Sequence, residues 1–117
     1  MRTMQLLQGL EFDAKEAHAQ PLFVDKDGRV LRFTLHPGQT IKEHNTSNSP
    51  FYVIVLKGSG TFAGGDGKEQ TLGPNSLLIF NPMENHVIHA LGQELVFLGI
   101  LHGAPGNESD RVGGMLG

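Results

Sequence analysis

The stretch that decides the fold runs from Gly38 to Gly60 and reads Gly-Gln-Thr-Ile-Lys-Glu-His-Asn-Thr-Ser-Asn-Ser-Pro-Phe-Tyr-Val-Ile-Val-Leu-Lys-Gly-Ser-Gly. It begins in a turn and places His44 in a short extended segment. A polar loop follows. Phe51 to Leu56 is then an apolar run rich in β-branched and aromatic residues, which is typical of a buried strand. A glycine-containing turn, Lys57 to Gly60, ends that run.

A second stretch, Gly73 to Ala90, has the same plan. It opens with a turn, continues as the apolar run Ser76 to Phe80, turns again at Pro82 and reaches His86. Two histidines at the ends of two strands, far apart in the chain, are the constellation in this sequence that suggests chemistry. We therefore treat His44 and His86 as the centre of the candidate site.

The composition favours an all-β domain. At 117 residues the chain has the length of one domain. Its 16 glycines and 6 prolines fit many turns between short strands. The chain reads as about eight or nine short strands at even spacing without a long helical pattern, and such a pattern predicts a sandwich or barrel.

Charge and composition exclude several classes of function. The net charge is −3 and there is no basic cluster, so we expect no nucleic-acid partner. The absence of cysteine excludes disulfides, thiolate ligands and a thiol nucleophile. The N-terminus lacks the apolar core of a signal peptide, and no apolar run approaches the ~20 residues of a membrane span. We expect a cytoplasmic protein with no membrane partner.

The chain divides into three parts in this interpretation. Residues 1–20 form an N-terminal arm, residues 21–102 form the barrel, and residues 103–117 form a flexible C-terminal tail. The barrel opens with a strand at Leu22 to Val24. Asp25 to Gly28 then predicts a hairpin turn, because glycine tolerates positive φ and aspartate favours turns.

Side-chain alternation assigns faces to the next segments. Val30 to His36 alternates with period two, so its apolar and polar side chains lie on opposite faces of a strand. The apolar face carries Leu31, Phe33 and Leu35, and the other carries Arg32, Thr34 and His36. The same count puts Lys42, His44 and Thr46 on one face of the following segment.

The two stretches resemble the paired motifs of the cupin superfamily, whose members are small double-stranded β-helix (jelly-roll) barrels. In the first family motif a glycine is followed by His-x-His, a glutamate and a second glycine. Gly38, His44 and Gly58 match this motif. Thr46 stands in the place of the second histidine, and Phe51 stands in the place of the glutamate.

The second family motif places a glycine, Pro-x-Gly, a histidine and an asparagine in that order. His86 matches the histidine, and Pro82 fits the proline-rich loop before it. The remaining places hold Asn75, Asn81, Met83 and Ala90. The resemblance covers residues 22–102 and implies an all-β double-stranded β-helix (jelly-roll) cupin barrel. Because the superfamily includes enzymes, storage proteins and regulatory domains, the fold does not choose among activities.

The family motifs hold a metal, so the resemblance implies that His44 and His86 bind a divalent transition metal (Zn, Ni, Mn or Fe). Two histidines alone hold such a metal weakly, because a useful site has three or four protein ligands. His36 and His102, each at the end of a predicted strand, are the candidates to complete the set. His89 is less suited, because its odd spacing from His86 puts it on the opposite face of a strand.

Four further residues are candidates to line a pocket. Thr46 and Phe51 make the predicted site more apolar than a metal centre, as pockets for organic ligands are. Arg32 is a candidate anchor for a carboxylate, with a solvated surface arginine as the alternative. Phe80 is a candidate lining residue at the pocket mouth.

These residues leave three functions open. The chain is a metal-binding cupin, a metal-free cupin that binds a small organic ligand, or a structural or regulatory module that acts by dimerisation. We expect a homodimer, because the strand from Phe51 to Leu56 carries apolar residues on both faces and needs cover on both. The sequence does not decide whether the protein is an enzyme, nor which substrate it takes.

Overall fold

The computed structural model describes residues 1–46 and 48–103, and this part of the chain is built from β-strands without a helix. The strands are β1 (His18–Val24), β2 (Gly28–Leu35), β3 (Thr40–His44), β4 (Phe51–Lys57), β5 (Gly60–Ala63), β6 (Glu69–Leu72), β7 (Leu77–Phe80), β8 (His86–Ala90) and β9 (Leu95–His102). The predicted all-β class is confirmed. Within the same residues there is no helix long and apolar enough to cross a membrane.

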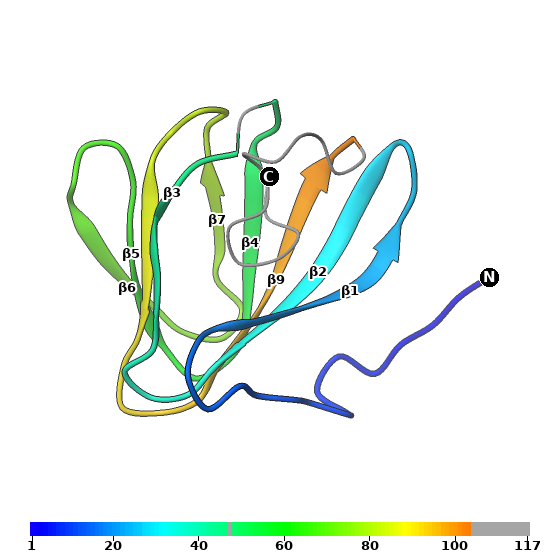
Figure 1. Cartoon of the computed structure of the whole chain (residues 1–117), viewed down its shortest axis with the longest axis horizontal. Coiled ribbons are helices and arrows are strands. Elements are labelled where there is room, and N and C mark those ends of the chain that lie inside the picture. The colour runs from blue at the N-terminus through cyan, green and yellow to red at the C-terminus, as the bar shows by residue number, and fades with distance from the viewer. Residues whose placement is uncertain (47, 104–117) are drawn as a thin grey trace.

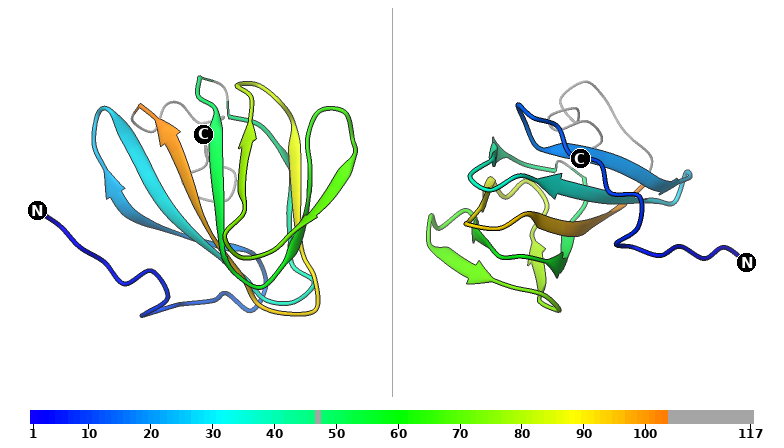
Figure 2. Two further views of the ribbon diagram at one scale, coloured as in Figure 1. Left: turned by 180° about the vertical axis from the view of Figure 1, so that it is seen from behind. Right: turned by 90° about the horizontal axis from the view of Figure 1, so that it is seen from below.

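The strands form two antiparallel sheets that face each other (Figure 1). Sheet A has the strand order β1-β2-β9-β4-β7, and sheet B has the order β3-β8-β5-β6. Because β9 pairs with both β2 and β4, the last strand lies at the centre of sheet A. Figure 2 shows the two layers from behind and from below.

The core lies between the sheets and follows the period-two alternation of the strands. In β4, Phe51, Val53 and Val55 are fully buried on the inner face. Tyr52 and Ile54 alternate with them and lie half-buried on the outer face. The apolar run is therefore a strand that is covered completely on one side and partly on the other.

The N-terminal segment deviates from the predicted boundaries. β1 begins at His18, earlier than predicted, so part of the expected arm belongs to sheet A. The predicted hairpin turn after β1 is confirmed, because Asp25 Oδ1 accepts hydrogen bonds from the N–H groups of Asp27 and Gly28 at 2.8 and 3.0 Å. The predicted tail, residues 103–117, lies outside the described residues from position 104 onward.

Arg32 lies on the outer face of sheet A and holds the N-terminal arm. Its guanidinium donates hydrogen bonds to the carbonyls of Leu6, Gln8 and Gly9 and to Oε1 of Gln20, at 2.6 to 3.1 Å. The side chain is buried under the arm. Both sequence-based readings of Arg32, a pocket residue and a solvated surface residue, are therefore wrong.

One end of the barrel gathers most of its long loops, and we call it the loop end. There the N–H of Met83 donates to the carbonyl of Thr46 at 2.8 Å. The N–H of Gly65 donates to Oε2 of Glu84, also at 2.8 Å. The loop end consists of residues 45–46, 48–50, 64–68 and 81–85, together with the β1–β2 turn. At the opposite end the chain turns between β2 and β3 and between β8 and β9.

Candidate functional site

His44 and His86 lie beside each other on the inner face of sheet B, at the loop end. They are directly opposite in the pairing of β3 with β8. Their ring centroids are 6.0 Å apart and the ring planes are 81° from parallel. Both are buried, His44 at 9% exposure and His86 at 1%. The structure thus brings together the two histidines that the sequence singled out.

A β-bulge turns His44 inward. Regular alternation would place His44 on the face of Lys42 and opposite Ile41. The register of β3 with β8 instead shifts between Ile41 and His44, and both residues are buried while Lys42 is exposed. A bulge inserts one extra residue and re-aims the side chain that follows it. The predicted shared face of Lys42 and His44 is therefore wrong.

Two phenyl rings pack against His86. Phe80 stacks on the imidazole with ring centroids 4.4 Å apart, and Phe51 lies at 5.3 Å. Phe51 and Phe80 are opposite each other in β4 and β7, on the inner face of sheet A. Both phenyl side chains are buried. We call this pair the aromatic wall; sheet B sets His86 against it.

His86 is held as a neutral imidazole. Its Nδ1 lies 3.3 Å from the carbonyl oxygen of Glu84, and because a carbonyl only accepts, Nδ1 carries the proton. Burial lowers the pKa of His86 from 6.5 to about 4, and the neighbouring His44 acts in the same direction. Nε2 then carries a lone pair. It is buried and has no hydrogen-bond partner among the described residues.

Thr46 belongs to the framework of the loop end. Its hydroxyl donates to the carbonyl of Ser49 at 2.7 Å, and the side chain is fully buried. Ser49 Oγ in turn accepts from the backbone N–H of His102, also at 2.7 Å. These bonds connect Thr46 and Ser49 to the end of β9. The proton of the Thr46 hydroxyl is therefore already used in a hydrogen bond within this loop.

Glu84 joins the 81–85 loop to the hairpin between β5 and β6. Its carboxylate accepts from the N–H groups of Gly65 at 2.8 Å and Asn81 at 2.9 Å. These two bonds, Gly65 first, lower the pKa of Glu84. A Cβ at Gly64 would meet the same carboxylate, so the glycine permits this close approach. Because its carbonyl also bonds His86, Glu84 anchors the loop and orients the imidazole.

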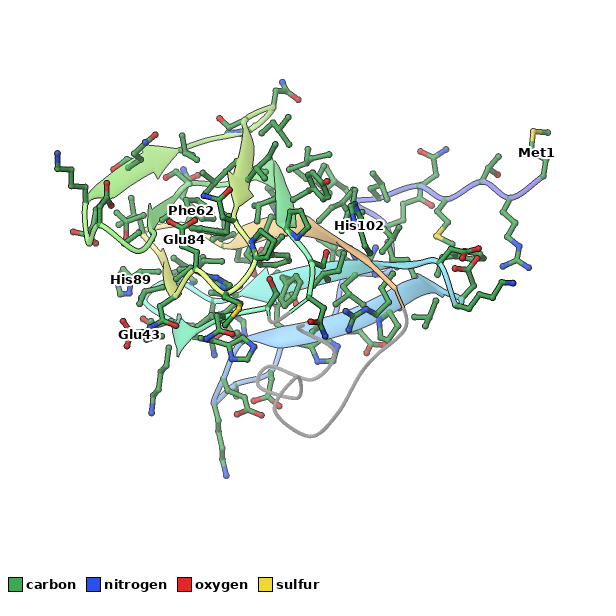
Figure 3. All side chains as sticks on the ribbon, turned by 90° about the horizontal axis from the view of Figure 1, so that it is seen from above. Met1, Glu43, Phe62, Glu84, His89 and His102 are labelled. Carbon is green, nitrogen blue, oxygen red and sulfur yellow. The ribbon has the colours of Figure 1, made fainter. Side chains whose placement is uncertain are left out.

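His36 and His102 are not brought to the pair. His36 stacks on a phenyl ring of the arm with centroids 4.9 Å apart, beyond the end of β2 that is remote from the loop end. His102 is exposed on the outer face of sheet A, and its Nε2 lies 3.1 Å from the hydroxyl of Tyr52. His89 faces away from His86, as predicted. Figure 3 shows His89 and His102 well separated across the molecule.

The ligand set of a mononuclear metal site is therefore not assembled from the described residues. His44 and His86 offer two nitrogen donors, whereas such sites use three or more protein ligands. In residues 1–46 and 48–103 no group of three or more His, Cys, Asp or Glu side chains is placed to hold a metal ion. The buried ring of Phe51 occupies the place of the family's glutamate. His36 and His102 do not complete the set.

Two residues of this region were missed by the sequence reasoning. Arg29 is 3% exposed in β2, where it shares the inward parity of Leu31 and Phe33. This alternation could have indicated an inward-facing side chain, but an arginine at the start of a strand is more often a surface residue. Glu84 was also missed. Its signal was local: it follows Asn81 by three residues in a proline-containing turn.

A cupin domain model matches residues 31–101, which is more than half of the chain. The chain therefore belongs to the cupin family. This agrees with the paired turn-and-strand motifs around His44 and His86. No match was found among curated proteins.

Solved structures give the same fold. A double-stranded β-helix protein from Klebsiella pneumoniae superposes with a TM-score of 0.83 at 18% identity, over 92% of this chain and 94% of that one. A protein from Thermus thermophilus also has a TM-score of 0.83, at 19% identity over 90% and 100% of the two chains. An RmlC-like cupin from Desulfovibrio desulfuricans has a TM-score of 0.76 at 21% identity, over 86% and 96%. The predicted double-stranded β-helix is confirmed.

Proposed function

We propose that this cupin binds a small organic molecule at the histidine pair, beside the aromatic wall, without requiring a metal. The observation that carries the proposal is Nε2 of His86, a buried acceptor that has no partner among the described residues. Leaving a buried polar atom unpaired costs about 1–3 kcal/mol. A ligand hydroxyl or N–H bonded to this nitrogen would remove that cost.

The surroundings of the acceptor define the chemistry of the ligand. Phe51 and Phe80 present apolar faces, which favour a planar or apolar body. With a pKa of about 4, His86 stays neutral near pH 7 and accepts a hydrogen bond. A base with a pKa so far below the working pH takes up a proton weakly. The site therefore favours binding by hydrogen bond over general-base catalysis.

The test is thermal denaturation of protein purified without a nickel column and dialysed against chelator, with a panel of small phenols, sugars and acids. A ligand of the native state raises Tm with its concentration. We expect at least one organic compound to do so, and His86→Phe to abolish the effect. His89→Gln, which changes a histidine of the same strand on the outer face, should retain it. Stabilisation by metal ions alone would overturn the proposal.

The metal site expected from the sequence stays a prediction and is tested on the same protein. Metal analysis without chelator would support it if stoichiometric Zn, Ni, Mn or Fe were found and His44→Ala removed it. Substoichiometric metal that His44→Ala leaves unchanged would support the organic-ligand proposal. Both arms start from one purification that is divided before the dialysis against chelator, so they can be compared directly.

The homodimer also stays a prediction. Leu77 and Ile79 are 62% and 49% exposed on the outer face of β7, beside the half-buried Ile54 and Tyr52. Light scattering at micromolar concentration distinguishes a monomer from a dimer. A monomer would argue against the dimeric module as the function of the chain.

A further inference from the structure

In this structure the acceptor nitrogen of His86 is shut off from solvent. The residue is 1% exposed, and its Nε2 is buried without a hydrogen-bond partner among the described residues. A ligand that bonds to this nitrogen can reach it only after part of the protein has moved. The strands and the core between them are costly to open, whereas exposed loops open at a small fraction of the global free energy of unfolding. The loops around His86 are therefore the place for such a route.

Two hydrogen bonds close the loop end beside the histidine pair, and we call these two bonds the latch. Asn45 Nδ2 donates to Oδ1 of Asn85 at 2.9 Å. The N–H of Met83 donates to the carbonyl of Thr46 at 2.8 Å. In each bond one partner follows β3 and the other precedes β8, and the facing ends of these two strands carry the histidine pair. The latch therefore joins the two segments that lead to the buried nitrogen.

The latch is made of groups that part readily. The bond between Asn45 and Asn85 is exposed, so water can replace it at little cost. Met83 has a φ of 65°, in the left-handed region where a bulky side chain is strained. It is also 71% exposed, so little packing holds its side chain in place. Opening the latch releases this strain, which offsets part of the loss of the two hydrogen bonds.

The loop 81–85 is held together by bonds that do not belong to the latch. The N–H of Glu84 donates to the carbonyl of Asn81 at 3.1 Å, and the N–H of Asn81 donates to Oε1 of Glu84 at 2.9 Å. The other carboxylate oxygen of Glu84 accepts from the N–H of Gly65. None of these three bonds involves the segment that follows β3. The loop can therefore part from residues 45–46 without losing its own structure.

We propose that the latch controls access to the ligand site: the loop 81–85 parts from residues 45–46, and a small molecule then reaches Nε2 of His86 from the loop end. The arrangement described above is the closed form, in which the nitrogen is shielded. This inference rests on the proposed function, to which it adds the route by which the ligand enters.

The test measures access to His86 with a reagent that does not depend on the identity of the ligand. Diethyl pyrocarbonate acylates a neutral imidazole at the nitrogen that carries the lone pair, which in His86 is Nε2. Because this nitrogen is buried, its rate of acylation in the native protein follows the opening of the latch. His89, on the outer face of the same strand, is the internal reference. Tandem mass spectrometry of the labelled peptide assigns the ethoxycarbonyl group to one histidine or the other.

Removing one bond of the latch should speed the reaction. Asn85→Ala deletes the side-chain bond to Asn45, and we expect acylation of His86 to be about two- to tenfold faster. Gln93→Ala, exposed in the turn at the opposite end of the barrel, is the matched control and should leave the rate unchanged.

A disulfide in the latch should slow the reaction. Because His44 pairs with His86, Asn45 and Asn85 form the next pair of the same register. Opposite Cβ atoms in such a pair are about 4.5–5.5 Å apart, close to the separation that a disulfide bridges. The chain has no cysteine of its own, so Asn45→Cys together with Asn85→Cys supplies the thiols without a competing partner. The oxidised double variant should acylate His86 about tenfold more slowly than the same variant after reduction, because a locked latch leaves only rarer openings.

The outcomes separate the latch from the ligand. Equal acylation rates of His86 in the oxidised and reduced double variant would overturn the latch as the route. A His86 that stays unreactive both in the native protein and in Asn85→Ala would overturn it as well. A slower rate in the oxidised form, with His89 unchanged, would support the latch even if no organic compound raised Tm; the proposed ligand would then fail while the route stood.

Discussion

The ring of Phe80 lies nearly face to face with the imidazole of His86, with centroids 4.4 Å apart and planes 19° from parallel. Phe51, opposite Phe80 in the sheet, contacts the same imidazole. Phe51 stands where the family's first motif has its glutamate. A place that the motif gives to a carboxylate ligand therefore holds a ring that packs against one of the two histidines. The rings of Phe51 and Phe80 help to bury His86, and burial is the main cause that lowers its pKa.

The stack predicts the effect of removing Phe80. Phe80→Ala should destabilise the fold by about 3–5 kcal/mol, because it deletes a buried ring. It should also raise the pKa of His86, since water then reaches the imidazole. Urea unfolding measures the first effect, and an NMR titration of His86 measures the second.

The matched control for Phe80 is its neighbour on the same strand. Ile79 is 49% exposed on the outer face, so Ile79→Ala should cost much less stability and leave the pKa of His86 unchanged. An unchanged pKa in the Phe80→Ala variant would mean that the ring does not exclude water from His86.

Stability should fall as the pH drops from about 6.5 to about 4, because the buried His86 resists protonation. Its pKa is lower in the folded chain, so the unfolded chain binds more protons in this window and acid favours unfolding. The shift corresponds to about 3 kcal/mol, lost in full below the folded pKa. Urea midpoints measured from pH 7 to pH 4 follow this loss.

The comparison with variants isolates the contribution of His86 from that of the carboxylates. His86→Phe keeps a ring in place and removes the titrating group, so its stability should depend less on pH over the same range. His89→Gln on the outer face should keep the native slope. Equal slopes for native protein and His86→Phe would contradict the expected role.

The fold was predictable because its signals are local. Alternation in Val30 to His36 and the apolar run Phe51 to Leu56 each identify a strand by themselves. The hairpin turn at Asp25 to Gly28 needs only its own side-chain and backbone bonds. The family motifs then identified His44 and His86, because these two histidines match motif positions although the other ligand positions hold different residues.

The rest of the site depends on contacts between distant segments. His44 faces inward because β3 slips against β8, and a bulge depends on the partner strand as well as on its own residues. Arg32 is buried because the arm folds over it. Nothing in the alternation around Arg32 shows that a segment more than twenty residues away will cover that face. The placement of His36 beside the arm has the same origin.

The hydrogen bonds from Arg32 to the N-terminal arm predict that the arm is held less firmly when the guanidinium is replaced. Arg32→Lys keeps the charge but cannot donate to Leu6, Gln8, Gly9 and Gln20 together. We expect residues 1–12 to exchange amide hydrogens faster and to be cut sooner by protease, while the rest of the barrel stays protected. Lys68→Ala, an exposed cation on the β5–β6 hairpin, is the control. Unchanged protection of the arm would show that other contacts hold it.

The absence of a side chain at Gly99 in β9 leaves room for the ring of Phe51 in the aromatic wall, so substitutions at these two positions should not have additive effects on stability. A Cβ at this position would collide with the ring of Phe51 and come within 2.8 Å of the ring of Phe33. Gly99→Ala should therefore destabilise the fold by about 1–3 kcal/mol and push Phe51 toward His86. Adding Phe51→Leu should recover part of the loss, because a smaller side chain makes room for the methyl group.

The control for Gly99 is Gly92, in the turn between β8 and β9. A Cβ there meets no atom within 4 Å, so Gly92→Ala should change stability by less than about 0.5 kcal/mol. Urea unfolding of the two single variants, Phe51→Leu and the double variant completes the cycle. Purely additive losses would mean that Gly99 and Phe51 do not share space. A double variant that loses less stability than the sum of the two single variants would show that Gly99 and Phe51 share space. The glycine in β9 would then be the residue that makes room for an aromatic ring where the family motif has its carboxylate.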